Sequence, residues 1–119
     1  MMKAIFFDID GTLVSFKTHC ISPAVLSGLR RLQAKGIKLF IATGRHRESI
    51  GPAADVFPFD GFITVNGQYC FSGDQVLRDN PIPHPVIAQQ VELLEASKAP
   101  CLFLSDEGTL YVNPDPLTD

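Results

Sequence analysis

KAIFFDIDGTLV, residues 3–14, is the stretch that decides the fold of this 119-residue chain. It opens as an apolar run without alternation, which is typical of a strand buried on both faces in a parallel sheet. The run then stops at two carboxylates, Asp8 and Asp10. Close carboxylates repel each other and raise each other's pKa, so the pair does not serve the stability of a strand. A divalent cation would explain it, because Mg²⁺ prefers oxygen ligands of this kind.

The residues that follow predict a strand, a helix and a second strand. Ser22 is a favourable N-cap with Pro23 at the first helical position, and Gly36 is well placed to end the helix. Strands over residues 3–8 and 37–42 then flank the helix. This spacing favours a right-handed crossover with the two strands parallel.

Further elements continue the pattern to about residue 80. A second helix is expected after residues 43–45, broken or kinked at Gly51-Pro52. A third strand is predicted over residues 61–65, beside the second, so that the first strand lies at one side. Ser72-Gly73-Asp74-Gln75 predicts a hairpin between residues 68–71 and 76–79.

Three prolines, Pro81, Pro83 and Pro85, indicate a boundary. The interpretation is therefore half of a doubly wound core over residues 1–80 and the beginning of a second α+β unit over residues 81–119. In that second unit we expect a helix carrying Ile87, Val91 and Leu94, strands over residues 101–105 and 109–112, and no element over residues 113–119.

The composition narrows the class of protein. Hydrophobic residues make up 45% of the chain and charged residues 19%, which is typical of a globular protein. The net charge of −3 and the lack of a basic stripe argue against a nucleic-acid partner. The apolar runs are too short to span a membrane, and no signal-peptide pattern opens the chain, so a cytoplasmic location is expected. An odd count of three cysteines without a CxxC pair predicts free thiols.

Three short motifs resemble those of one family. Residues 8–13, DIDGTL, resemble the first signature of the haloacid dehalogenase (HAD) superfamily of phosphohydrolases. Residues 41–45, IATGR, resemble the second signature in the form found in its Cof-type sugar-phosphatase branch, and residues 63–67, ITVNG, resemble a third element. Their order and spacing also match, and together they are far more specific than a lone pair of aspartates.

The resemblance implies an α/β fold: an HAD-like doubly wound parallel sheet, here a partial Rossmann-like core. In this family a cap domain is inserted after the first signature or after the third strand. Residues 12–21 are too few for a folded cap and should form a loop or small hairpin, so we expect an α+β cap inserted after the third core strand. The family's later lysine and acidic signature have no match, which suggests the N-terminal portion of a longer phosphatase that is inactive alone.

The resemblance also assigns the chemistry. Asp8 would be the nucleophile and form an aspartyl phosphate, and it would ligate Mg²⁺ through its side chain. Asp10 would ligate Mg²⁺ through its backbone carbonyl and act as general acid and then general base, for which a pKa raised toward neutrality helps. The expected partner is a small phosphorylated metabolite, and a sugar phosphate by analogy with the branch.

Seven further residues are predicted to bind substrate phosphate or shape its site. Gly11 would let the loop fold closely, and Thr12 would pin that loop through its hydroxyl. Thr43 would offer a hydroxyl and an N–H to phosphate at the start of a helix. The set is Gly11, Thr12, Thr43, Gly44, Arg45, Asn66 and Gly67.

Open alternatives remain within that set. Arg45 could reach substrate or simply be exposed, and Asn66-Gly67 could be only a turn pair. Gln68 stands where the branch often has Ala, which weakens detailed expectations for this loop.

Two other functions compete with a phosphohydrolase. A signalling receiver domain also has an acidic pair after its first strand, but it needs an aspartate just after the third, where this chain has Asn66. A non-catalytic module that binds metal or phosphate without turnover is the stronger alternative. The sequence does not indicate an oligomeric state.

Overall fold

The computed structural model describes residues 1–51, 55–105 and 107–114. The chain divides into two compact units, Met1–Asn80 and Pro81–Asp119. No helix within the described residues has both the length and the apolar character needed to cross a bilayer. Cys20, Cys70 and Cys101 are free thiols, as predicted.

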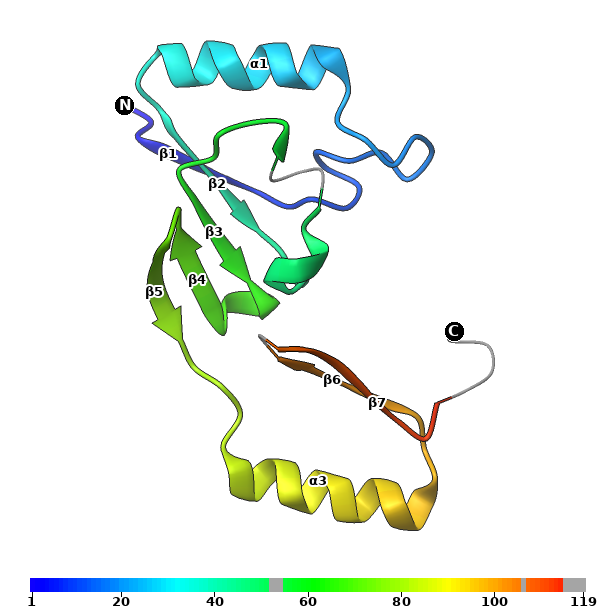
Figure 1. The fold of residues 1–119 in the computed structure, drawn as a ribbon. Helices are drawn as coiled ribbons and strands as arrows, with labels where there is room; N and C mark the ends of the chain where they lie inside the picture. Colours follow the sequence, from blue (N-terminus) through cyan, green and yellow to red (C-terminus); the bar gives the residue numbers. More distant parts are fainter. Residues whose placement is uncertain (52–54, 106, 115–119) are drawn as a thin grey trace. The chain divides into compact units, whose positions relative to one another are not determined.

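A five-stranded sheet forms the frame of the first unit (Figure 1). Its strands lie in sequence order, and the first three are parallel while the last two run antiparallel to their neighbours. The strands are β1 (Ala4–Phe7), β2 (Lys38–Ala42), β3 (Gly61–Thr64), β4 (Tyr69–Ser72) and β5 (Gln75–Asp79). The predicted hairpin is thus confirmed, and it extends the parallel strands into a mixed sheet.

The predicted strand order is confirmed, because β1 lies at one side and pairs with β2. The apolar run is typical of burial on both faces, but in the described residues β1 is an edge strand whose side chains are only partly covered. Phe6 is 55% exposed, and the ring of Phe40 stacks on it with centroids 4.8 Å apart. An edge strand has a neighbour on one side only, so an apolar run alone cannot guarantee its burial.

Helix α1 (Pro23–Ala34) begins and ends as the sequence predicts. The backbone N–H of Val25 donates to Ser22 Oγ over 3.3 Å, and Gly36 adopts a left-handed φ of +81° just beyond the C-cap. Leu29 points from the helix into the core and is only 2% exposed. The crossover from β1 through α1 to β2 therefore forms as predicted.

One apolar core holds the first unit together. Leu39 and Ile41 of β2 are fully buried, and they alternate with less buried neighbours as expected for a sheet with one covered face. The N–H of Leu39 donates to Asp60 Oδ2, and the N–H of Asp60 donates to the carbonyl of Leu39, each over 2.7 Å. These hydrogen bonds tie the start of β3 to β2. The buried cluster consists of Ile9, Leu13, Leu29, Leu39, Ile41, Ile50, Phe57, Phe59 and Phe71.

The second helix differs from the prediction. Within residues 46–51 there is only η1 (Arg47–Ser49), a short 3₁₀ turn, in place of an α-helix. Gly51 adopts a φ of +57°, which ends regular helical geometry there. Pro52 and the two residues after it lie outside the described residues.

The second unit is a helix followed by a hairpin, as predicted. Helix α3 (His84–Ser97) precedes β6 (Cys101–Ser105) and β7 (Gly108–Val112), which pair antiparallel. Asn113 fastens the hairpin to the helix end, because its Nδ2 donates to the carbonyls of Leu94 (2.9 Å) and Ala99 (3.1 Å). The predicted unstructured tail beyond residue 114 lies outside the described residues.

Candidate active site

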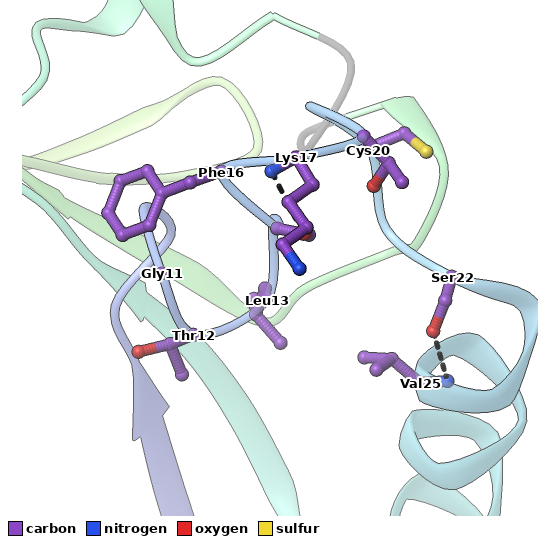
Figure 2. Close-up of a pocket in the computed structure, with 10 residues that line it drawn as sticks. Gly11, Thr12, Leu13, Phe16, Lys17, Cys20, Ser22 and Val25 are labelled. Carbon is purple, nitrogen blue, oxygen red and sulfur yellow. Dashed lines mark hydrogen bonds between the residues drawn. The ribbon is translucent and has the colours of Figure 1, made fainter.

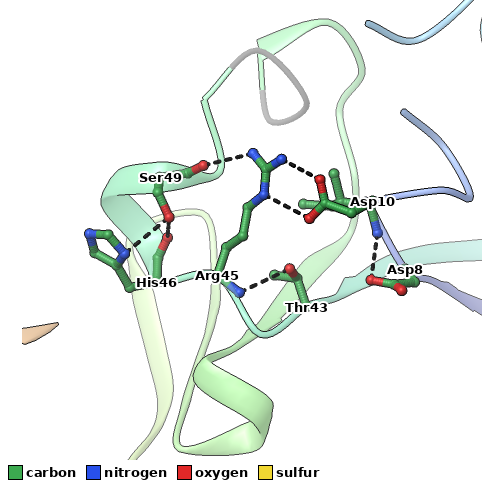
Figure 3. Close-up of polar contacts among 7 residues, drawn as sticks. Asp8, Asp10, Thr43, Arg45, His46 and Ser49 are labelled. Atoms are coloured by element: carbon green, nitrogen blue, oxygen red, sulfur yellow. Dashed lines mark hydrogen bonds and ion pairs between the residues drawn. The ribbon is translucent and has the colours of Figure 1, made fainter. Parts of the chain in front are cut away.

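The carboxyl ends of three parallel strands carry the predicted site residues. Asp8 follows β1, Thr43 follows β2, and the short turn η2 (Val65–Gly67) follows β3. Parallel strands present these ends at one edge of the sheet, which is where open α/β sheets bind ligands. Figure 3 shows Asp8 and Asp10 beside Thr43 and Arg45 at this edge.

The loop after β1 is closed by backbone hydrogen bonds. Gly11 N–H donates to Val14 O, and Val14 N–H donates to Ile9 O, each over 2.9 Å. Gly11 has a φ of +78°, which favours glycine, and a Cβ there would lie 2.6 Å from the ring of the exposed Phe16, which would have to move. Within the described residues the Thr12 hydroxyl forms no hydrogen bond that would pin the loop, contrary to expectation, and the backbone bonds take that part.

Beside this loop lies an open cavity of about 390 Å³ (Figure 2). Lys17 and several hydroxyl-bearing side chains lie on its wall, with Leu13 and Val25 as apolar neighbours. The residues around it are Gly11, Thr12, Leu13, Ser15, Phe16, Lys17, Thr18, Cys20, Ser22 and Val25.

Asp8 and Asp10 are held in different ways. One carboxylate oxygen of Asp8, Oδ1, accepts the N–H of Ile9 over 2.8 Å. Asp10 instead forms a two-pronged contact with Arg45: Nε donates to Oδ2 over 2.9 Å, and Nη2 donates to Oδ1. The two predicted acids lie near each other (Figure 3), and among the described residues only Asp10 of the two carries an ion pair.

The pKa of Asp10 departs from the expectation. The hydrogen bonds from Arg45 hold the pKa of that carboxyl below its ordinary value, although the small desolvation of the group opposes this. The same contact raises the pKa of the Arg45 guanidinium. The expected rise toward neutrality is absent because Asp10 faces a cation rather than a second carboxylate.

Thr43 is buried in the second-motif loop, with 6% of its surface exposed. Its Oγ1 accepts the N–H of Arg45 over 3.1 Å, and its carbonyl accepts the N–H of Asn66 over 3.2 Å. The expectation that Thr43 starts a helix is wrong for the described residues, because η1 begins only at Arg47. A phosphate bound here would therefore meet the loop's own polar groups rather than a helix dipole.

Asn66 lies against the second-motif loop. A Cβ at Gly44 would be 3.2 Å from Asn66 Oδ1, so glycine leaves room for this side chain. Val65 N–H donates to Arg45 O over 3.0 Å, which joins the two loops. Val65, Asn66 and Gly67 all have left-handed φ, which is unusual for a β-branched residue such as Val65. Asn66-Gly67 therefore forms a turn and also packs against the second-motif loop.

Ser49, a further partner of Arg45, was not predicted. Ser49 offers its carbonyl to Arg45 Nη1 over 3.0 Å, and its hydroxyl lies 3.0 Å from His46 Nδ1 (Figure 3). The sequence carries no motif for this contact. It depends on the 3₁₀ turn found where the first part of an α-helix was expected.

The metal ligands suggested by the resemblance are few. Across the described parts of the chain, no three residues of the His, Cys, Asp and Glu types gather closely enough to hold a metal ion. Asp8 and the Asp10 carbonyl remain the two candidate ligands. Their oxygen chemistry fits Mg²⁺, which usually keeps several waters and is bound by one or two carboxylates together with substrate phosphate.

Comparison with known proteins identifies the family. The model of the haloacid dehalogenase-like hydrolase family matches residues 5–118. The chain belongs to this family. The pyridoxal phosphate phosphatase YbhA of Escherichia coli is 30% identical over 115 residues, covering 94% of this chain and 42% of its own length.

Solved structures agree. A HAD-superfamily phosphatase, BT1666 of Bacteroides thetaiotaomicron, matches with a TM-score of 0.88 and 33% identity, over 98% of this chain and 43% of that one. The HAD subclass IIB sugar phosphatase BT4131 matches with a TM-score of 0.80 and 38% identity, over 98% and 46%. The HAD-like α/β fold is therefore confirmed. The chain spans about two fifths of the length of the curated relatives it matches.

Proposed function

We propose that the protein carrying residues 1–119 is a Mg²⁺-dependent phosphohydrolase that acts on small phosphorylated metabolites through an aspartyl phosphate on Asp8. The supporting observation is the meeting of three motifs at one sheet edge. Hydrogen bonds join Asp10 to Arg45, Thr43 to Asn66, and Arg45 to Val65. Residues of three separate sequence motifs are thus joined by hydrogen bonds at this edge.

Each acid has a separate part in this proposal. An oxygen of Asp8 attacks phosphorus, the bond from phosphorus to the ester oxygen breaks, and Asp10 gives its proton to that oxygen. Asp10 then takes a proton from water, whose oxygen attacks the aspartyl phosphate and releases inorganic phosphate. The pairing with Arg45 favours the ionised form of Asp10, which the second half requires, and opposes the protonated form, which the first half requires.

Mg²⁺, when bound by the Asp8 carboxylate and the Asp10 carbonyl, would reduce the repulsion between nucleophile and phosphate. Thr43, Gly44, Asn66 and Gly67 would surround the phosphate from the second and third motifs. Gly11 and Thr12 would shape the loop on the nucleophile's side. We propose further that residues 1–80 form the catalytic core and residues 81–119 belong to the cap.

The substrate class rests on two relatives. One matched structure is named as a sugar phosphatase, and one curated relative is named as a pyridoxal phosphate phosphatase. We therefore propose a phosphate monoester of a small polyol or heterocycle. Sugar phosphates are the first compounds to assay.

The test is phosphate release from a panel of sugar phosphates, pyridoxal phosphate and nucleotides, with added Mg²⁺ and with EDTA. We expect turnover of at least one monoester that stops in EDTA and returns with Mg²⁺. Acid quenching during turnover of ³²P-labelled substrate should leave label on the protein at Asp8. Full turnover in EDTA, or binding of phosphate without release from any ester, would overturn the proposal, the second result in favour of a non-catalytic module.

A further inference from the structure

We propose that Arg45 is a positioning residue for Asp10 rather than a ligand of the substrate phosphate, an assignment that rests on the proposed function. Its contacts distinguish the two roles. An arginine that binds phosphate directs its paired N–H donors at the substrate, whereas a positioning arginine directs them at a catalytic side chain.

All three guanidinium nitrogens of Arg45 are engaged within the protein. Nε and Nη2 donate to the two carboxylate oxygens of Asp10, and Nη1 donates to the carbonyl of Ser49 over 3.0 Å. The Nε/Nη2 edge, one of the two edges through which a guanidinium can bind a phosphate with two hydrogen bonds, faces Asp10, and Nη1 of the other edge donates to Ser49. Substrate could take that edge only by removing it from the general acid.

The arginine is fixed at both ends. Its backbone N–H donates to Thr43 Oγ1 over 3.1 Å, and its carbonyl accepts the N–H of Val65 over 3.0 Å. The head of the side chain is held by Ser49, one turn further along the chain. A guanidinium fixed in this way holds the carboxylate of Asp10 in one orientation, which a mobile surface arginine could not do.

Stability alone is a weak explanation for this contact. The side chains of Arg45 and Asp10 are 35% and 44% exposed, and ion pairs with that exposure add little to folding. The neighbouring Arg47 places its guanidinium against an aromatic ring instead of a carboxylate: it lies 4.2 Å from the centre of the Phe71 ring. The two-pronged contact therefore has its larger value in the orientation of Asp10 and in offsetting one of two adjacent negative charges before a phosphate enters.

Two substrates distinguish a positioning role of Arg45 from phosphate binding. Glycerol phosphate has a poor alkoxide leaving group, whose oxygen needs the Asp10 proton, whereas the p-nitrophenolate released from p-nitrophenyl phosphate needs none. For glycerol phosphate, Arg45→Ala should lower kcat by roughly tenfold to a hundredfold, because small misplacements of catalytic groups have effects of this size. KM and inhibition by inorganic phosphate should stay within about twofold, as expected when only transition-state interactions are lost. The first-turnover burst of p-nitrophenolate should be unchanged.

Two further variants and a double-mutant cycle make the test specific. Arg45→Lys keeps the charge but loses the fork, so it should resemble Arg45→Ala and guards against misfolding of the alanine variant. Arg47→Ala is the matched arginine control and should leave both substrates unaffected. In an Asp10→Asn background, Arg45→Ala should add no further loss in kcat, because the two residues act as one unit.

The outcomes are distinguishable. If wild-type protein releases no phosphate from any ester, the proposed function fails, and the role of Arg45 fails with it. If wild-type protein is active but Arg45→Ala raises KM and weakens inhibition by inorganic phosphate for both substrates alike, Arg45 is a phosphate ligand and only the present inference is overturned. Additive losses in the cycle would overturn it as well.

Discussion

The two units of the chain bury apolar side chains to very different extents. The first unit has a cluster of nine buried hydrophobic residues, which connects α1, the sheet and the loops around the candidate site. In the described part of the second unit only Leu94 reaches that degree of burial, while Leu102, Leu110 and Tyr111 of its hairpin are 46–63% exposed. A site that requires accurate geometry is better supported by the first unit, because packed neighbours lock the residues that carry it.

The first prediction tests whether the chemistry lies in the first unit. Asp8→Asn should lower phosphate release by at least about 10³-fold, as expected when a nucleophile is removed, while the melting temperature changes little. Asp74→Asn is the matched control, because Asp74 is an exposed residue of the turn between β4 and β5 and should keep full activity. Turnover of the Asp8 variant at the wild-type rate would remove the assignment of the nucleophile.

Much of the first unit follows from local sequence signals. Ser22-Pro23 and Gly36 mark the two ends of α1 because capping depends on neighbouring residues alone. The turn at Gly73-Asp74 likewise fixes the β4–β5 hairpin. The meeting of Asp8, Thr43 and Asn66 at one edge follows from the parallel order of β1, β2 and β3.

The features that were missed depend on contacts between distant residues. Arg45 and Asp10 are 35 residues apart, and nothing in either motif states that one holds the other. The 3₁₀ turn at residues 47–49 is likewise decided by what packs against it. Propensity and periodicity describe a segment but not its neighbours, so such features need the folded chain.

The second prediction compares the same side chain in strands of the two units. Leu39 of β2 is fully buried, whereas Leu110 of β7 is 63% exposed. Leu39→Ala should lower the free energy of unfolding by about 2–5 kcal/mol, because it removes buried methyl groups and leaves a cavity. Leu110→Ala should change it by less than about 0.5 kcal/mol. Urea denaturation of both variants measures the difference, and equal losses would contradict the contrast in packing.

The third prediction asks whether the second unit opens by itself. Asn113 donates to the carbonyls of Leu94 and Ala99 and has a left-handed φ of 50° that alanine tolerates poorly. Asn113→Ala should therefore destabilise the second unit by about 1–2 kcal/mol. Native-state hydrogen exchange should show faster exchange of α3 amides, while β2 amides exchange as in the wild-type protein. Matching acceleration in β2 would show that the two units unfold together.

The last prediction has the smallest expected effect and concerns the folding stability of the first unit at low pH. Both ion pairs found among the described residues, Lys38–Asp60 and Arg45–Asp10, lie there. The hydrogen bonds from Arg45 place the folded-state pKa of Asp10 below its unfolded value of 3.8. The stabilisation is therefore fully present above pH 3.8 and is lost as the pH falls through the lower, folded-state pKa.

The stabilisation from the Arg45–Asp10 ion pair is small. The Asp10 side chain is 44% exposed, and solvent screens such a pair to less than about 1 kcal/mol. Asp10→Asn removes the titrating group and serves as the reference. The difference in unfolding free energy between wild-type protein and this variant, measured in urea, should be constant around neutral pH and should shrink below pH 3.8. A difference that grows as the pH falls would mean that folding raises the pKa of Asp10. Arg45 would then not govern that carboxylate in solution.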